Sequence, residues 1–174
     1  MPDSYLQLRA RVDDLGTAIV ADNADRIACG AGCHECCVDG LTLVPVEAAV
    51  LGGELGLERE RVHALIDVPP GADRGRCVLL DGDGRCTAYP ARPIVCRTEG
   101  LPLSYPEPTG VIVCELNFRG AVPDRTSAFD MTNLEAALFA VNLEYCRLSG
   151  VDPLGRVAID QLAEAAGIHP CPDE

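Results

Sequence analysis

The chain has 174 residues, of which 48% are hydrophobic and only 4% aromatic, a composition typical of one globular domain with an aliphatic core. Its net charge of −13 disfavours binding to nucleic-acid phosphates, and its 14 basic residues are all Arg, which excludes a Schiff-base lysine and a Walker-type phosphate loop. No apolar run approaches the ~20 residues of a membrane span, and the N-terminal segment lacks the pattern of a signal peptide. We therefore expect a cytoplasmic protein with reduced thiols and with no nucleic-acid or membrane partner.

The N-terminal segment is predicted to be helical over residues 4–28. Apolar side chains recur there at intervals of 4, 3 and 4 residues, which places them on one face of a helix: Leu8, Val12, Leu15 and Ile19. Gly30 and Gly32 are expected to end this helix, and a loop with four cysteines follows.

Two short helices are predicted after a brief apolar run at residues 41–44. Pro45 suits the first turn of a helix that continues over 46–55, and a second helix is expected over 58–66. Pro, Gly and Asp residues in the segment 67–75 indicate a linker loop.

A hairpin is predicted over residues 77–89, because two β-prone arms flank the turn sequence Asp-Gly-Asp-Gly that begins at Asp81. A calcium loop would place Glu at the twelfth position from Asp81, but Arg92 stands there, so this alternative is excluded. A further strand is expected over residues 111–118.

The sequence predicts two helices in the C-terminal part, about residues 130–167. The first covers 132–148 and starts with a capping box formed by Thr132 and Glu135. Its apolar stripe consists of Leu134, Leu138, Val141, Tyr145 and Leu148. The second follows an Asp-Pro pair, which suits a helix start, and ends before Gly167.

Ten cysteines are the most unusual feature of the chain, and four of them lie within residues 29–37. The spacing of Cys33 and Cys36 lets two sulfurs reach one ion at the ~2.3 Å of a zinc–thiolate bond, and it also serves iron–sulfur clusters. Cys36 and Cys37 are adjacent, so their side chains diverge and either face two sites or leave one cysteine buried. Eight cysteines from Cys29 to Cys114 would supply two four-thiolate sites.

Arg and His residues near the cysteines are further candidates. Arg76, Arg85 and Arg97 each adjoin a cysteine and would offset thiolate charge, although chance placement is an equal alternative. His34 lies inside the cluster, and we expect it to support the ligands or face solvent rather than to bind metal. We expect His63 at the surface and His169 in a frayed terminus.

Two stretches together resemble the signature of the CxxCxxCC family of cysteine-cluster proteins, also called the YkgJ family. They are Cys-x-x-x-Cys-x-x-Cys-Cys at 29–37 and Gly-x-Cys-x-x-Tyr-x-x-Arg-Pro-x-x-Cys-Arg at 84–97. Cys77 and Cys114 stand where that family has an intermediate and a late cysteine, so the resemblance covers about residues 29–115. The chain departs from the pattern by one extra residue in the first gap and by Ala88 in place of a bulkier aliphatic residue.

The resemblance implies a zinc- or iron-chelating protein, and together with the spacing it predicts eight metal ligands: Cys29, Cys33, Cys36, Cys37, Cys77, Cys86, Cys96 and Cys114. Cys146 and Cys171 lie outside the matching region and are expected to be dispensable for metal. The predicted fold is α+β and mostly helical, a single domain over residues 1–174 with a small β-hairpin or sheet and metal-binding cysteine loops.

The leading functional hypothesis is a metal-binding protein that holds an iron–sulfur cluster or zinc and has an electron-transfer or accessory role beside a protein partner. One alternative is a metal-dependent oxidoreductase or protein-modifying enzyme, for which no catalytic residue is evident. Another is a structural zinc module for protein interaction. A secreted, disulfide-bonded domain is allowed by the even number of cysteines but has no signal peptide to support it.

Overall fold

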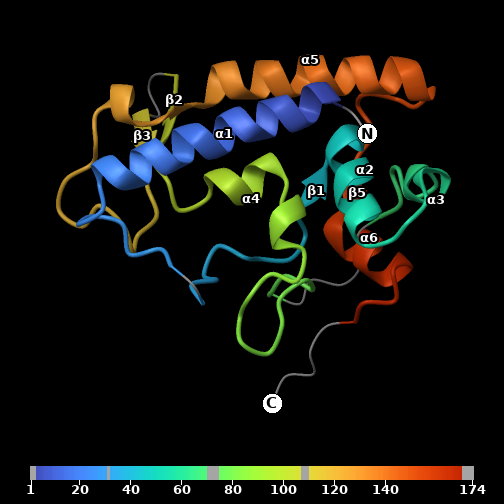
Figure 1. Ribbon diagram of the computed structural model, residues 1–174, viewed down its shortest axis with the longest axis horizontal. Coiled ribbons are helices and arrows are strands. Elements are labelled where there is room, and N and C mark those ends of the chain that lie inside the picture. Colours follow the sequence, from blue (N-terminus) through green and yellow to red (C-terminus); the bar gives the residue numbers. More distant parts are fainter. Residues whose placement is uncertain (1–2, 31, 70–74, 107–109, 170–174) are drawn as a thin grey trace. The chain divides into compact units, whose positions relative to one another are not determined.

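The computed structural model describes residues 3–30, 32–69, 75–106 and 110–169 (Figure 1). Helices predominate over short strands in these residues, which confirms the predicted mostly helical α+β class. The described residues form two compact units, one made of residues 32–69, 75–93 and 141–169 and the other of residues 3–30, 94–106 and 110–140. The single domain expected from the sequence stays a prediction. Among the described helices, none combines the length and the apolar character needed to cross a membrane.

The first unit contains three complete α-helices, the 3-10 helix η1 (Tyr89–Ala91) and a small antiparallel sheet. The α-helices are α2 (Pro45–Glu54), α3 (Arg59–His63) and α6 (Ile159–Ala165), and strand β1 (Thr42–Leu43) pairs with β5 (Val157–Ala158). Pro45 occupies the first turn of α2, where its missing N–H leaves no helical hydrogen bond unmade, so the predicted helix start is confirmed. The aliphatic core of this unit includes Leu43, Ala48, Leu51, Val62, Val78, Leu79, Val157 and Leu162.

Gly52 sets how closely α2 and α3 approach each other in the first unit. A Cβ atom at this position would lie 2.5 Å from Cγ2 of Val62, which is fully buried. The absence of a side chain at Gly52 therefore lets the short helix α3 pack directly against α2. Helix α3 ends at His63 rather than at the predicted residue 66.

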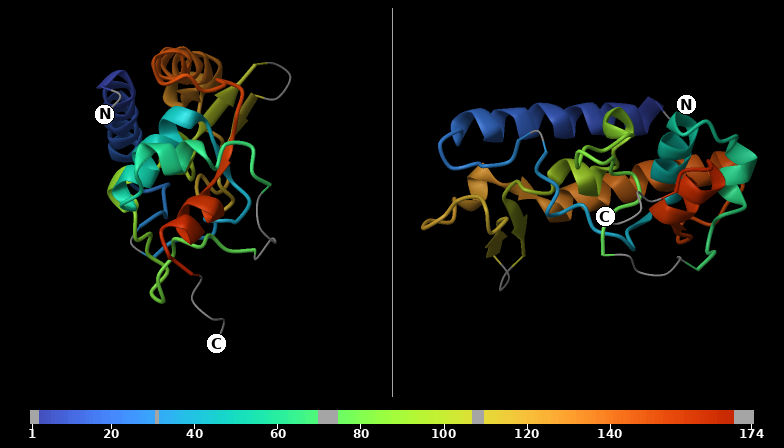
Figure 2. Two further views of the ribbon diagram at one scale, coloured as in Figure 1. Left: turned by 90° about the vertical axis from the view of Figure 1, so that its right-hand side faces the viewer. Right: turned by 90° about the horizontal axis from the view of Figure 1, so that it is seen from below.

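The second unit combines helix α1 (Asp3–Asp22) and helix α4 (Ile94–Thr98) with a three-stranded sheet. Strand β2 (Leu103–Tyr105) lies in the middle of the sheet, antiparallel to β3 (Gly110–Ile112) and parallel to β4 (Phe129–Asp130). All three views place α4 alongside α1 (Figures 1 and 2). The long helix α5 (Met131–Ser149) contributes residues 131–140 to this unit and its remaining residues to the first.

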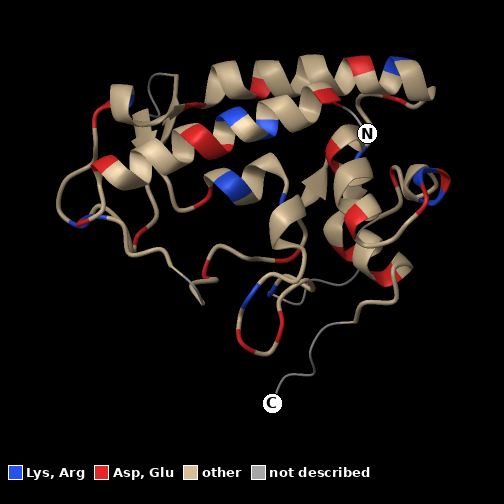
Figure 3. Cartoon of the chain, viewed as in Figure 1, with Lys and Arg blue, Asp and Glu red and all other residues tan. Residues whose placement is uncertain are grey.

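An ion pair joins α4 to α1 within the second unit. The Arg97 guanidinium, whose side chain is only 7% exposed, donates to both carboxylate oxygens of Asp13 at 2.6 and 2.7 Å. Figure 3 shows the basic residue of α4 beside α1, while acidic residues are spread along the helices and loops. Because Arg97 is bound to Asp13, its charge holds α4 against α1.

Helix α1 is shorter than predicted and buries a slightly different face. It ends at Asp22, and the Asn23 side-chain amide donates to the Ile19 carbonyl at 2.9 Å, which satisfies one of the last carbonyls of the helix. Leu15 is 46% exposed, whereas Gly16 is buried, because its bare Cα lets Leu101 approach to 3.3 Å of a Cβ position there. The periodicity therefore identified the helix but misassigned one position of its buried stripe.

Three other predicted elements differ in the structure. Residues 77–89 form a looped hairpin with a single bridge, between Leu80 and Cys86, instead of two strands. The strand expected over 111–118 ends at Ile112. The Asp-Pro pair starts a turn rather than a helix, because the Asp152 carboxylate accepts from the Leu154 N–H at 2.9 Å, and α6 begins only at Ile159 after strand β5.

The start of α5 is capped by a residue other than the predicted one. The helix covers Met131–Ser149, which confirms the prediction of 132–148, but Asp130 precedes it and accepts the Asn133 backbone N–H at 3.1 Å. The Asn133 side-chain amide returns a bond of 2.7 Å to the same carboxylate. Asp130 is thus the N-cap, and the predicted capping box of Thr132 with Glu135 is wrong. The end of the stripe is also wrong, since Leu148 is 72% exposed while Asn142 and Cys146 are buried.

We predict that Asp130→Ala will lower the free energy of unfolding by about 1 kcal/mol, the usual effect of removing an N-cap side chain. Thr132→Ala, the matched control, should change it by less than about 0.5 kcal/mol because the exposed Thr132 does not cap the helix. Urea unfolding followed by circular dichroism measures both. Equal destabilisation by the two substitutions would contradict the assignment of Asp130 as the cap.

Candidate metal centre

A tight loop brings Cys77 and Cys86 together in the first unit. The Asp81 carboxylate accepts the backbone N–H groups of Asp83 at 2.9 Å and of Arg85 at 2.8 Å, which closes the turn. Outside the turn, the Thr87 N–H donates to the Leu79 carbonyl at 2.8 Å. The Asp-Gly-Asp-Gly sequence therefore makes the turn that was predicted from it, and the turn returns the chain to Cys77 after nine residues.

Cys37 lies beside this pair of cysteines. The backbone N–H of Cys77 donates to the carbonyl of Cys37 at 3.0 Å, so the first cysteine loop and the 77–86 loop are hydrogen-bonded to each other. The ionisation of Cys77 depends on Cys86 and Cys37, and that of Cys86 also depends on Cys37. Three of the eight predicted ligands are therefore close enough for their charges to interact.

Both loop thiols are withdrawn from water, and both receive a backbone hydrogen bond. Burial raises the pKa of the Cys77 thiol, and the hydrogen bond from the Leu79 backbone opposes the rise. Burial likewise raises the pKa of Cys86, opposed by the backbone of Ala88. Each sulfur thus accepts from the residue two positions further along the chain. An N–H group aimed at sulfur stabilises a thiolate more than a thiol, because a charged acceptor forms the stronger bond.

Tyr89 and Arg92, two residues of the second cysteine motif, form a stacked pair. The Arg92 guanidinium carbon lies 3.7 Å from the centre of the Tyr89 ring, a cation–π contact. The charge of Arg92 lowers the pKa of Cys86, opposing the effect of burial. Tyr89 therefore orients the cation that acts on Cys86, whereas Arg76 and Arg85, the arginines next to Cys77 and Cys86 in the sequence, are exposed.

His34 packs against the Gly84 turn of the same unit. A Cβ atom on Gly84, whose φ is +74°, would lie 2.7 Å from His34 Nδ1. His34 Nδ1 is 2.9 Å from the Gly32 carbonyl, so Nδ1 carries a proton and, in the neutral ring, Nε2 keeps its lone pair. A proton held on one nitrogen by a backbone carbonyl is the usual arrangement of a ligating imidazole. The expectation that His34 only supports the site stays a prediction.

A second group of cysteines lies in the other unit. Cys29 is exposed, and its sulfur accepts the side-chain N–H of Asn117 at 3.2 Å. Cys114 is half-buried, and its carbonyl accepts the backbone N–H of Asn117 at 2.9 Å. Cys96 lies on α4, the helix that Arg97 fixes to α1. Nothing in the motif spacing indicated Asn117, since it follows the last predicted ligand by three residues and no pattern connects it with Cys29.

The remaining cysteines and histidines differ in their surroundings. Cys33 is exposed and Cys36 half-buried in the turns of residues 32–40. Cys146 is 2% exposed, and Cys171 lies outside the described residues. His63 is half-buried rather than at the surface, with its Nε2 2.8 Å from the Tyr145 hydroxyl, while His169 is exposed.

The donor set fits a thiophilic metal. The nine described cysteines are free thiols, and thiolates are the ligands that zinc and iron–sulfur clusters prefer. The hydrogen bonds to the sulfurs of Cys29, Cys77 and Cys86 are of the kind that supports metal-bound thiolates. Within the described part of the chain, no three or more Cys, His, Asp or Glu side chains converge as a ready-made ion cage.

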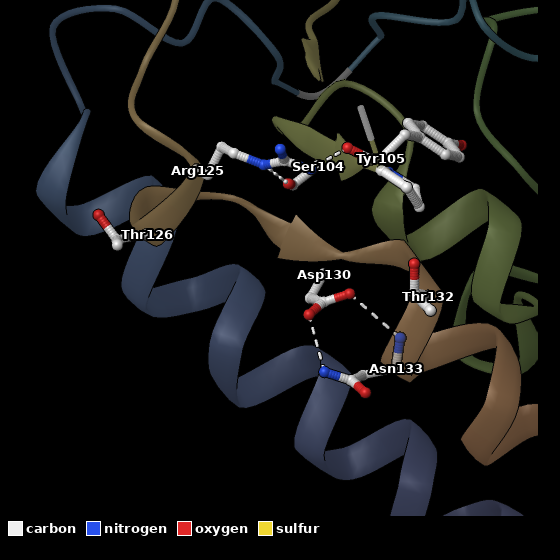
Figure 4. A pocket seen from close by; sticks show the side chains of 8 residues that line it. Ser104, Tyr105, Arg125, Thr126, Asp130, Thr132 and Asn133 are labelled. Atoms are coloured by element: carbon white, nitrogen blue, oxygen red, sulfur yellow. Dashed lines mark hydrogen bonds between the residues drawn. The ribbon is translucent and has the colours of Figure 1, made fainter. Parts of the chain in front are cut away.

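An open hollow of about 480 Å³ lies elsewhere, at the edge of the β2–β4 sheet (Figure 4). Its polar groups bond to one another: Arg125 donates to the Ser104 hydroxyl at 3.0 Å and to the Tyr105 carbonyl, and Asp130 holds Asn133. The lining contains no Cys or His. These bonds tie strand β2 to the segment before α5, so we assign the hollow a structural role.

We predict that the reduced, metal-free protein will lose stability as the pH rises above the ordinary thiol pKa of about 8.5. Cys77 and Cys86 have raised pKa values when folded, so the unfolded chain ionises them at lower pH and gains stability relative to the folded state. Below that pH both states are protonated and the contribution is fully present. Urea unfolding between about pH 7 and pH 10 in the presence of a chelator measures how the free energy of unfolding changes with pH.

The double variant Cys77→Ala, Cys86→Ala is the control for this prediction. It should show a smaller decrease in stability over the same pH range, because Cys146, whose pKa burial also raises, remains in place. An unchanged slope in this variant would show that the two thiols are not the cause.

Comparison with known proteins gives one match. Residues 28–110 match the model of the CxxCxxCC family, described as "Putative zinc- or iron-chelating domain". No curated protein and no solved structure matches the chain. The matched region contains both cysteine motifs, the loop from Cys77 to Cys86 and the stacked pair of Tyr89 and Arg92. Residues 28–110 are therefore similar to the CxxCxxCC family, as the cysteine pattern predicts.

Proposed function

We propose that the protein binds a zinc or iron–sulfur centre through the thiolates of its CxxCxxCC domain. The observation that carries the proposal is the 3.0 Å hydrogen bond from the Cys77 N–H to the Cys37 carbonyl, which joins two cysteine loops whose thiols lie close enough for their charges to interact. The eight cysteines predicted from the sequence are the proposed ligands: Cys29, Cys33, Cys36, Cys37, Cys77, Cys86, Cys96 and Cys114.

The surroundings of the loop thiols favour a bound cation over a proton. Partly buried thiols such as Cys77 and Cys86 are poor acids on their own, because a thiolate in apolar surroundings lacks hydration. A metal ion replaces that hydration by direct bonds to sulfur and displaces the proton. The backbone N–H groups of Leu79 and Ala88 then stabilise the sulfur charge that the metal leaves uncompensated.

The proposed ligands divide between the two units. Cys33, Cys36, Cys37, Cys77 and Cys86 belong to the first, and Cys29, Cys96 and Cys114 to the second. Adjacent Cys36 and Cys37 suit more than one metal atom, which favours an iron–sulfur centre over a single zinc ion. With iron–sulfur, the protein would have an electron-transfer or accessory role; with zinc, it would be a structural module.

Anaerobic purification followed by elemental analysis and an absorption spectrum tests the proposal. Iron with matching sulfide and a broad visible band would support the cluster, and colourless protein with zinc would support structural sites. Protein that contains neither metal, and that takes up neither Zn²⁺ nor Fe²⁺ with sulfide after reduction of its thiols, would contradict the proposal.

We further predict that Cys86→Ala will lower the metal content by at least one equivalent or abolish it, since it removes a thiolate that has its own hydrogen-bond donor. The matched control is Cys146→Ala, which removes a buried thiol outside the motifs and should leave the metal content unchanged. Metal analysis of the two variants purified side by side measures the difference. A loss of metal in Cys146→Ala alone would show that Cys146 is a ligand and that the proposed set of ligands is wrong.

A further inference from the structure

One buried asparagine outside the matched residues contacts two segments, residues 28–29 and Gly100. Asn117 is 2% exposed and lies seven residues beyond the end of the family match. Its Oδ1 accepts the Ala28 N–H at 2.7 Å, and its Nδ2 donates to the Gly100 carbonyl at 2.5 Å and to the Cys29 sulfur at 3.2 Å. All of these residues belong to the second unit.

The two backbone partners fix the orientation of the Asn117 amide. The Ala28 N–H can only donate, so it requires the amide oxygen, and the Gly100 carbonyl can only accept, so it requires the amide nitrogen. A flipped amide would place donor against donor and acceptor against acceptor. The second N–H of the amide is therefore directed at the Cys29 sulfur by contacts that do not involve sulfur.

Gly100 holds the Cys29 sulfur from another side. A Cβ atom at position 100 would lie 2.7 Å from Cys29 Sγ, and the φ of Gly100 is +84°, which other residues rarely adopt. The sulfur of Cys29 thus rests against bare backbone while the neighbouring amide donates to it. Although the Cys29 residue is exposed, its sulfur has a defined place.

A second buried asparagine in the chain shows the opposite polarity. Asn142 is fully buried, its Oδ1 accepts the Val46 N–H at 3.1 Å, and its Nδ2 donates to the Pro153 carbonyl at 2.9 Å. The nearby Cys146 sulfur lies 3.6 Å from Oδ1, so its thiol acts as the donor. Cys146 therefore contacts an acceptor that suits a protonated thiol, whereas Cys29 contacts a donor that suits a metal-bound thiolate.

We infer that Asn117 is a positioning residue for the metal ligand Cys29: it holds the Cys29 sulfur in place and donates a hydrogen bond to it in the metal-bound state. This inference rests on the proposed function. It adds to the ligand Cys29 a supporting residue that lies beyond the matched residues 28–110, and this support compensates for the extra residue between Cys29 and Cys33.

Titration of the reduced protein with Co²⁺ tests the inference, because thiolate-to-cobalt charge-transfer absorption reports how many sulfurs bind. Asn117→Ala should weaken Co²⁺ binding about 10- to 100-fold, as loss of a residue that supports a metal ligand usually does. Its charge-transfer intensity per bound ion should fall by the share of one thiolate. Asn142→Ala, the matched control, removes a buried amide with two backbone partners and should leave both quantities unchanged.

A double-mutant cycle separates an effect through Cys29 from general loss of stability. In a Cys29→Ser background, Asn117→Ala should have no further effect on Co²⁺ affinity, because the sulfur that it supports is absent. If Asn117→Ala does not fold, Gly100→Ala replaces it, with Gly120→Ala as control: both glycines have positive φ, but a Cβ at Gly120 meets nothing within 4 Å. Gly100→Ala should then weaken Co²⁺ binding and Gly120→Ala should not.

The possible failures are distinguishable. Wild-type protein that binds no Co²⁺, Zn²⁺ or iron would overturn the proposed function together with this inference. Wild-type protein that binds Co²⁺ with the same affinity and intensity as Asn117→Ala would overturn only the role of Asn117. Equal weakening by Asn117→Ala and Asn142→Ala, or an undiminished effect of Asn117→Ala in the Cys29→Ser background, would do the same.

Discussion

A sulfur atom that leaves water resists becoming a thiolate, and the structure around the cysteines meets this constraint with hydrogen-bond donors. The half-buried Cys77 and Cys86 each accept a backbone N–H from two residues further along, and the exposed Cys29 accepts an N–H from a buried amide. The turn closed by Asp81 lies between the residues that donate to Cys77 and to Cys86, so one loop supplies both donors. Cys146, which lies outside the cysteine motifs, instead contacts an acceptor, the Asn142 side-chain oxygen, and this contact suits a protonated thiol.

The same constraint explains the residue types that accompany the cysteines. Arg92 stands over Tyr89 and acts on Cys86 through its charge, although it is six positions away from that cysteine in the sequence. Arg97, directly next to Cys96, is instead bound to Asp13. Sequence proximity to a cysteine is therefore a poor guide to which arginine compensates thiolate charge, because a long side chain reaches across the fold.

Long periodic segments and turn chemistry were predictable from the sequence, and contacts between distant residues were not. The helices α2 and α5 and the turn at Asp81 follow from proline placement, apolar periodicity and Asp-Gly pairs. Strands β1, β4 and β5 have two residues each, too few for any alternation to be visible. The cap of α5 was missed because Asp130 and Thr132 both suit the position and only the backbone decides between them. Of the candidate site, spacing gave the cysteines, but the partner of Cys29 depends on the tertiary fold that brings Asn117 to it.

The structure of the loop between Cys77 and Cys86 also limits how the sequence of this region can change in evolution. Its length of eight residues is set by the Asp81 turn, the bridge at Leu80 and the close approach of Gly84 to His34. Exchange of one exposed residue for another within the turn, for example at Gly82, disturbs none of these contacts. An inserted or deleted residue would rotate one sulfur away from the other and break the Leu80 bridge. Point substitutions should therefore accumulate in this loop over evolution, while its length stays constant.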